Sequence, residues 1–257
     1  MRWVVLAIGL AACSFSAPPA LIDGASDTPR DMPVDMDTSG RVTMDLIALW
    51  TFDDAASPAL DTAGAGTPVA LPVIAGAPTF SGGTLVVDAA ARLASDLQPH
   101  LNADCKNAMA ATLEAWVAPQ SAMQGTGPEP VLVAGLSASI NSRNISLLQA
   151  GDKWLGRART TADVNGKPDL LSMMPVAATM THVVLVVDAG TRKLYVNSVK
   201  AAEDAPGPPL SWDSSYRMML ANEFSQTRPW LGTFALVAMY KRALTEPEIK
   251  RNFDAGP

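Results

Sequence analysis

Few residues in this chain of 257 have the type and spacing that catalysis requires. Its two histidines, His100 and His182, lie near no nucleophile motif, and the sequence contains no Gly-x-Ser-x-Gly, His-Glu-x-x-His or phosphate-binding glycine loop. His182 lies within an apolar run, which predicts a buried structural histidine. His100 lies in a loop-like segment, where surface exposure is the simplest interpretation. The absence of these motifs predicts a protein that is not an enzyme.

Aromatic side chains offer a second kind of chemistry, the stacking of an indole ring on a sugar face. Trp50 and Trp116 lie in strongly apolar segments, so we expect both in the core. Three others lie nearer to predicted loops and are the candidate ligand-binding residues: Trp154, Trp212 and Trp230. A tryptophan that anchors a loop against the core is the alternative interpretation.

Composition limits the class of protein that must position these residues. Hydrophobic residues make up 48% of the chain and charged residues 17%, which favours one sizeable globular domain over a disordered chain. The net charge of −6 argues against nucleic-acid binding through a basic surface. Two cysteines allow at most one disulfide, and they lie too far apart in sequence for a cysteine-rich zinc module.

The first residues have the features of an export signal. One arginine precedes an apolar run that is too short to cross a bilayer as a helix. The run ends in Leu10-Ala11-Ala12-Cys13, which resembles the bacterial lipobox. This resemblance implies a lipoprotein signal peptide over residues 1–12, acylation of Cys13 and, because Ser14 follows, a lipid-anchored position in the bacterial envelope, at the outer membrane or cell surface. An ordinary signal peptide with an incidental Cys13 is the alternative.

Residues 13–44 are expected to form a disordered tether. Proline and spaced like charges oppose both regular structure and collapse, and five aspartates lie in this segment: Asp23, Asp27, Asp31, Asp35 and Asp37. The simplest role for such a segment is a spacer that holds the folded part away from the membrane.

From residue 45 onward, short apolar runs alternate with turns rich in Gly, Pro, Asn and Asp. This pattern predicts an antiparallel sandwich or barrel. Residues 182–187 have the continuous apolar character of a central strand, and residues 193–199 complete a hairpin with them. Thr245 and Glu248 form a capping box, and Ile249 and Phe253 share one helix face. We therefore expect a single short helix near the carboxyl terminus, which covers an open end of the sandwich.

Four segments in the same order carry a family resemblance. They are residues 49–53, with the sequence LWTFD; residues 112–119, TLEAWVAP; residues 181–184 with 194–197, THVV and LYVN; and residues 230–249, from WLGTF to TEPEI. Together they resemble laminin-G-like, concanavalin A-like domains. The resemblance implies an all-β fold over residues 45–257, an antiparallel two-sheet jelly-roll sandwich with a short C-terminal helix.

The resemblance also implies a metal site, because laminin-G-like domains often hold one Ca²⁺ ion with oxygen ligands from their loops. Asp53, Asp54 and Asp61 follow the first predicted strand and are the candidate ligands. Ordinary solvated acidic loops are the alternative. Glycosidases with this fold carry a Glu-x-Asp-x-x-Glu strand that brings their catalytic carboxylates together, and that spacing is absent from this sequence.

These features favour a non-catalytic, lipid-anchored recognition domain. Its expected partner is a polysaccharide or an envelope or extracellular protein, held at the loop rim or on the concave face of the sandwich. The alternatives are a structural or assembly component of the envelope without a separable ligand, and a cryptic polysaccharide hydrolase. If Cys13 is acylated, Cys105 is left as either a buried small hydrophobe or a free thiol.

Overall fold

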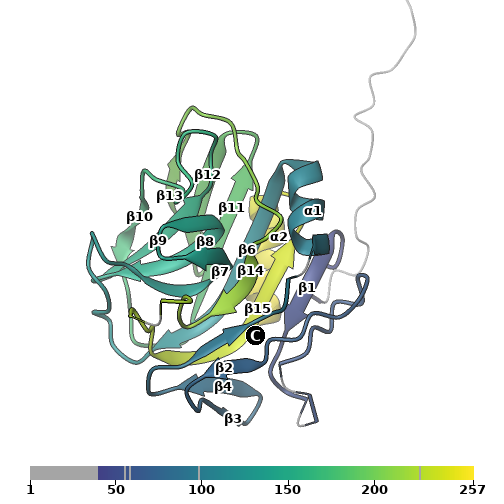
Figure 1. Ribbon diagram of the computed structural model, residues 1–257, viewed down its shortest axis with the longest axis vertical. Coiled ribbons are helices and arrows are strands. Elements are labelled where there is room, and N and C mark those ends of the chain that lie inside the picture. Colours follow the sequence, from purple (N-terminus) through teal and green to yellow (C-terminus); the bar gives the residue numbers. More distant parts are fainter. Residues whose placement is uncertain (1–39, 55, 58, 98, 226) are drawn as a thin grey trace, which may run out of the picture. The chain divides into compact units, whose positions relative to one another are not determined.

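A computed structural model describes residues 40–257 except residues 55, 58, 98 and 226. The predicted signal peptide, Cys13 and most of the predicted tether lie outside these residues. The described part folds into two antiparallel sheets and two helices (Figure 1). This confirms the predicted jelly-roll sandwich with its short C-terminal helix.

The two sheets contain fifteen strands among the described residues. The first sheet runs in spatial order β13 (Val199–Asp204), β12 (Thr191–Val196), β11 (Thr181–Asp188), β6 (Ala110–Pro119), β15 (Gly232–Tyr240), β4 (Thr84–Val87) and β3 (Thr79–Ser81), and β1 (Leu46–Trp50) also pairs with β15. The second sheet runs β10 (Leu170–Pro175), β9 (Lys153–Ala158), β8 (Ser142–Ala150), β7 (Val131–Ser139), β14 (Arg217–Leu220), β5 (Arg92–Ala94) and β2 (Val73–Ala75).

The main core lies between the sheets and follows the alternation of side chains along each strand. On β11, Val183 and Leu185 face this core, while Val184 and Val186 belong to a second apolar cluster on the outer face. β11 pairs with both β12 and β6, so the predicted central strand and hairpin are confirmed. Because both of its faces are buried, this strand is apolar at nearly every position.

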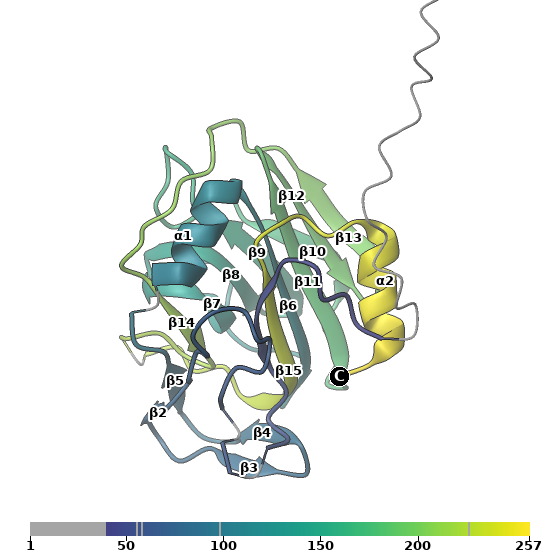
Figure 2. The same ribbon diagram turned by 90° about the vertical axis from the view of Figure 1, so that its right-hand side faces the viewer.

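The helix α2 (Glu246–Ala255) begins with the predicted capping box of Thr245 and Glu248. Ile249 is fully buried, and the ring of Phe253 stacks on Trp116 with centroids 5.6 Å apart. The helix therefore covers the outer face of the first sheet, as Figure 2 shows, and not an open end of the sandwich as the sequence led us to expect.

A second helix, α1 (Pro99–Ala108), was not predicted, and the expectation of a single helix is wrong. Leu101 and Cys105 lie four residues apart on one face of α1, and both are fully buried in the main core. Polar residues with low helix propensity surround these two positions, so tertiary packing is the main support for this helix.

The folded part also begins earlier than the predicted boundary at residue 45. The backbone N–H of Val42 donates to Asn252 Oδ1 at 2.9 Å, the Tyr240 hydroxyl donates to the carbonyl of Val42 at 3.0 Å, and the Val42 side chain is 1% exposed. Residues 40–44 therefore form a strap, named here the N-terminal strap, that is held between the first sheet and α2. The preceding residues are acidic and rich in proline, and the prediction extended the tether from them through residue 44.

Candidate functional site

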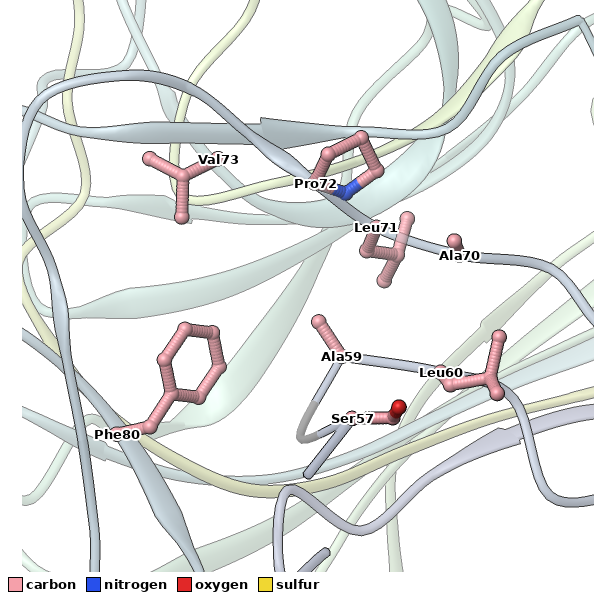
Figure 3. Close-up of a pocket in the computed structure, with 8 residues that line it drawn as sticks. All are labelled: Ser57, Ala59, Leu60, Ala70, Leu71, Pro72, Val73 and Phe80. Atoms are coloured by element: carbon pink, nitrogen blue, oxygen red, sulfur yellow. The ribbon is translucent and has the colours of Figure 1, made fainter. Parts of the chain in front are cut away.

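An apolar groove with a volume of about 360 Å³ lies where the two sheets end, beside β2 of one sheet and β3 of the other. Eight residues line it, and Figure 3 shows their side chains: Ser57, Ala59, Leu60, Ala70, Leu71, Pro72, Val73 and Phe80. At the other side of the sandwich, β10 and β13 lie beside each other. The last strand of each sheet is hydrogen-bonded on one side only at both sides of the sandwich, and the groove lies at the side formed by β2 and β3.

Backbone hydrogen bonds fix the walls of the groove. The N–H of Leu71 donates to the carbonyl of Ala59 at 2.8 Å, and Leu60 forms an antiparallel bridge with Ala70. The indole N–H of Trp50 donates to the carbonyl of Val69 at 2.9 Å, which ties this wall to the core. Backbone hydrogen bonds thus hold the segments that form the groove, which favours a groove of fixed shape.

The lining of the groove is suited to apolar ligand groups. The Phe80 ring projects toward the space between Val73 and Leu71 in Figure 3. The Phe52 ring packs against Phe80 at a centroid distance of 6.5 Å. Leu60 is 38% exposed and Val73 is 40% exposed, so apolar surface is open to water there. Ser57 supplies the single side-chain hydroxyl among the lining residues. Concave apolar surface of this kind is typical of ligand sites.

The three carboxylates predicted to bind Ca²⁺ do not form a cluster of acidic side chains. Asp61 is buried, and its Oδ1 already accepts the N–H groups of Leu49 at 2.7 Å and Ala63 at 2.8 Å, so it acts as a structural acceptor beside the groove. Asp53 and Asp54 are exposed and accept local hydrogen bonds within their own loop. Across residues 40–257, as far as the structure describes them, no three His, Cys, Asp or Glu side chains could jointly hold a metal ion. The expected Ca²⁺ site therefore gains no support from clustered carboxylates, and it stays a prediction.

The three tryptophans predicted to contact a ligand are buried. Trp154 is 1% exposed, Trp212 is 8% exposed and Trp230 is 0% exposed. The Trp230 indole N–H donates to Gln149 Oε1 at 2.9 Å, and its ring meets Phe234 edge-on at 4.9 Å. None of these rings offers a free face to a sugar, so the prediction of sugar stacking is corrected in favour of the alternative, loop anchoring.

The outer face of the second sheet is occupied by a buried ionic network. Arg143 makes two hydrogen bonds to the Glu223 carboxylate at 2.8 and 3.0 Å, and Arg157 pairs with Asp169 at 2.7 Å. Arg143 and Glu223 are almost fully buried. These charged groups are already paired with one another. A ligand that bound to this face would have to break their ion pairs first.

A second buried network lies beneath α2 and contains His182. The imidazole Nε2 lies 2.9 Å from Glu114 Oε1, and Trp116 stacks on the ring at 4.9 Å. Arg41 of the N-terminal strap also pairs with Glu114, and Asn252 donates to the other Glu114 oxygen at 2.7 Å. His182 is 0% exposed, which confirms the prediction of a buried structural histidine.

Cys105 lies in the core and is free of a disulfide. Burial raises the pKa of its thiol, and the nearby Asp104 carboxylate acts in the same direction. The thiolate that reacts with oxidants and disulfides is therefore suppressed. Of the two interpretations of Cys105, the buried small hydrophobe is the one that the structure supports.

The two-sheet architecture defines the class of protein as a lectin-like β-sandwich. Comparison with known proteins agrees with this class. The laminin G family described as the concanavalin A-like lectin/glucanases superfamily matches residues 95–250, more than half of the chain. The chain belongs to this family. Among curated proteins, none matches the sequence.

Several solved structures share the fold. The binding domain of botulinum neurotoxin DC in complex with SialylT is similar with a TM-score of 0.63 and 9% identity, over 83% of this chain and 52% of that chain. The same binding domain in complex with rat synaptotagmin II gives 0.64 and 8%, over 83% and 52%. The binding domain of Paraclostridial Mosquitocidal Protein 1 gives 0.60 and 12%, also over 83% and 52%. This chain thus spans about half the length of these proteins, and at such low identity the likeness shows the fold alone.

Within the described residues, neither helix has the length and apolar character needed to span a membrane.

Proposed function

We propose that this chain is a non-catalytic recognition domain of the bacterial envelope that binds its ligand in the apolar groove. The groove itself carries the proposal, because it combines open apolar side chains with walls that are fixed by backbone hydrogen bonds. Such a site can bind without reacting, since no group that commonly acts as a nucleophile or base lines it apart from the Ser57 hydroxyl. Family membership agrees with a binding role, since lectins give the superfamily part of its name.

A charged side chain in the groove is expected to weaken recognition. Val73 is 40% exposed, so Val73→Lys can keep the fold while placing an ammonium group among the apolar lining residues. We expect at least about a tenfold loss of affinity, because desolvating the new charge opposes binding. The measurement is binding of the full chain carrying Cys13→Ala to arrays of bacterial polysaccharides and purified envelope proteins.

The matched control is Met173→Lys, at a position 79% exposed on β10, the other edge strand of the same sheet. Equal binding by the two lysine variants would contradict a ligand site in the groove. Release of reducing sugar from any polysaccharide on the array would contradict the non-catalytic assignment.

We further propose that a lipid on Cys13 anchors the domain to the envelope, at the outer membrane or cell surface. The support is the sequence Leu10-Ala11-Ala12-Cys13, with Ser14 in the following position. Cells that express the chain and are grown with a labelled fatty acid should yield a labelled protein in the membrane fraction. Cys13→Ala should carry no label and leave the membrane fraction, whereas Cys105→Ala should keep both properties. A labelled Cys13→Ala protein would refute the anchor.

A further inference from the structure

The groove lies in a part of the chain with a one-sided charge pattern. Between Arg41 and Arg92 there is no Lys, Arg or His, whereas five aspartates occur: Asp45, Asp53, Asp54, Asp61 and Asp88. All eight residues that line the groove come from this segment. The segment that forms the groove therefore contributes negative side chains but no positive ones.

Two of these aspartates lack a cationic partner and contact segments that carry lining residues of the groove. The Asp54 carboxylate accepts the N–H of Ala56 at 2.8 Å, and the backbone carbonyl of Asp54 accepts the N–H of Ser57, a lining residue, at 3.2 Å. Asp53 lies beside Gly83 in the turn that follows β3, the strand that carries Phe80. Both carboxylates are exposed, and neither forms an ion pair within the described part of the chain. By contrast, Asp45 lies within 4.0 Å of Lys241 and Asp61 is buried.

The backbone beside the groove is open to a further strand. β2 is hydrogen-bonded to β5 alone and β3 to β4 alone among the described strands. An edge strand presents unpaired N–H and C=O groups that an extended peptide can use. Val73 and Ile74 on β2 are 40% and 46% exposed, so apolar contacts are available next to these backbone groups.

These observations favour one kind of ligand for the groove over the others. A sugar presents many hydroxyl groups, and a lining with one side-chain hydroxyl would leave most of them without partners. A second copy of this chain would bring the same unpaired aspartates to the interface. The segment of residues 14–39 contains five aspartates and one arginine, so its net charge is negative and would be repelled by Asp53 and Asp54. An occupant with apolar and positive groups satisfies the site.

We propose that the groove binds an extended polypeptide segment of a partner protein, in which an apolar side chain is flanked by Lys or Arg. The apolar side chain lies against Phe80 and Val73, the peptide backbone pairs with the edge of β2, and the flanking cations face Asp53 and Asp54. This inference rests on the proposed function, and it specifies the partner of the same site.

The test uses the full chain carrying Cys13→Ala and short fluorescent peptides with a central Leu or Phe. One set of peptides has flanking Lys or Arg, and a matched set has flanking Glu. We expect the basic set to bind more tightly, with affinity that falls as salt is raised. Asp53→Asn with Asp54→Asn should weaken binding by roughly three- to tenfold and flatten the salt dependence, since the amides keep the local hydrogen bonds but lose the charges.

Two further variants separate this inference from the proposed function. Val73→Lys should abolish peptide binding and Met173→Lys should preserve it. Equal affinity for basic and acidic peptides, or no effect of the two Asp→Asn changes, overturns the basic–apolar peptide as the partner. If a polysaccharide binds instead and Val73→Lys removes it, the groove is retained as the site and the peptide inference fails. If Val73→Lys changes no binding at all, both fail.

Discussion

Glu114→Ala is expected to lower the free energy of unfolding by roughly 3–5 kcal/mol, the usual cost of breaking a buried ion pair from one side. Glu114 is fully buried on β6, where Arg41, His182 and Asn252 converge on its two oxygens. Removal of the carboxylate leaves the Arg41 guanidinium without its counter-charge beneath α2. The N-terminal strap and α2 should both loosen, because Arg41 and Asn252 hold them to the sheet.

Urea unfolding followed by tryptophan fluorescence measures this effect. Glu203→Ala is the control, because Glu203 forms an exposed pair with Lys200 at 2.7 Å on the edge strand β13 of the same sheet. That variant should unfold at nearly the same urea concentration as the unmodified chain. A Glu114→Ala protein that is as stable as the Glu203→Ala protein would show that the network contributes nothing.

The same network predicts a pH dependence. Burial alone would raise the pKa of Glu114, but the hydrogen bond with His182 and the charge of Arg41 outweigh it and lower the pKa below its ordinary value. The unfolded chain therefore takes up a proton at Glu114 before the folded chain does. Stabilisation by this group is complete above the unfolded pKa of about 4.3 and is lost as pH falls through the lower folded pKa. Glu114→Gln should lose less stability between neutral and acidic pH than the unmodified chain.

The parts of the fold that the sequence predicts are those with a local signal. The capping box of Thr245 and Glu248 and the apolar run of β11 each identify an element without reference to the rest of the chain. Helix α1 has a weaker local signal, the spacing of four between Leu101 and Cys105, and no capping motif in the sequence marks its start. The N-terminal strap is held by Asn252, more than two hundred residues away, so nothing nearby marks it.

The groove could not be predicted for a related reason. Ser57, Val73 and Phe80 come from three short segments, and the pairing of the sheets brings them together. In sequence, Val73 belongs to an apolar run that reads as a buried strand, and its exposure follows from the position of β2 at an edge. The one available signal is the absence of Lys, Arg and His between Arg41 and Arg92, which describes the charge around the groove but not its shape.

Trp230→Ala is expected to destabilise the fold by roughly 3–5 kcal/mol, the range for removing a large buried aromatic side chain. Trp230 is 0% exposed, and a Cβ built on Gly232 would come within 2.4 Å of its ring, which shows how closely the ring covers that glycine. The substitution also leaves Gln149 Oε1 without the indole donor. Thermal and urea unfolding measure the loss, and Trp230→Phe should recover part of it.

This prediction separates the two interpretations of the loop tryptophans. A ligand-stacking tryptophan can be replaced by alanine with loss of binding and little loss of stability, whereas an anchoring tryptophan shows the reverse. Phe224→Ala serves as a control, since Phe224 is 37% exposed in the same loop and should cost less stability. Loss of ligand at unchanged stability in Trp230→Ala would return the binding site to this loop. Loss of stability, with binding retained below the unfolding transition, would leave the groove between β2 and β3 as the site.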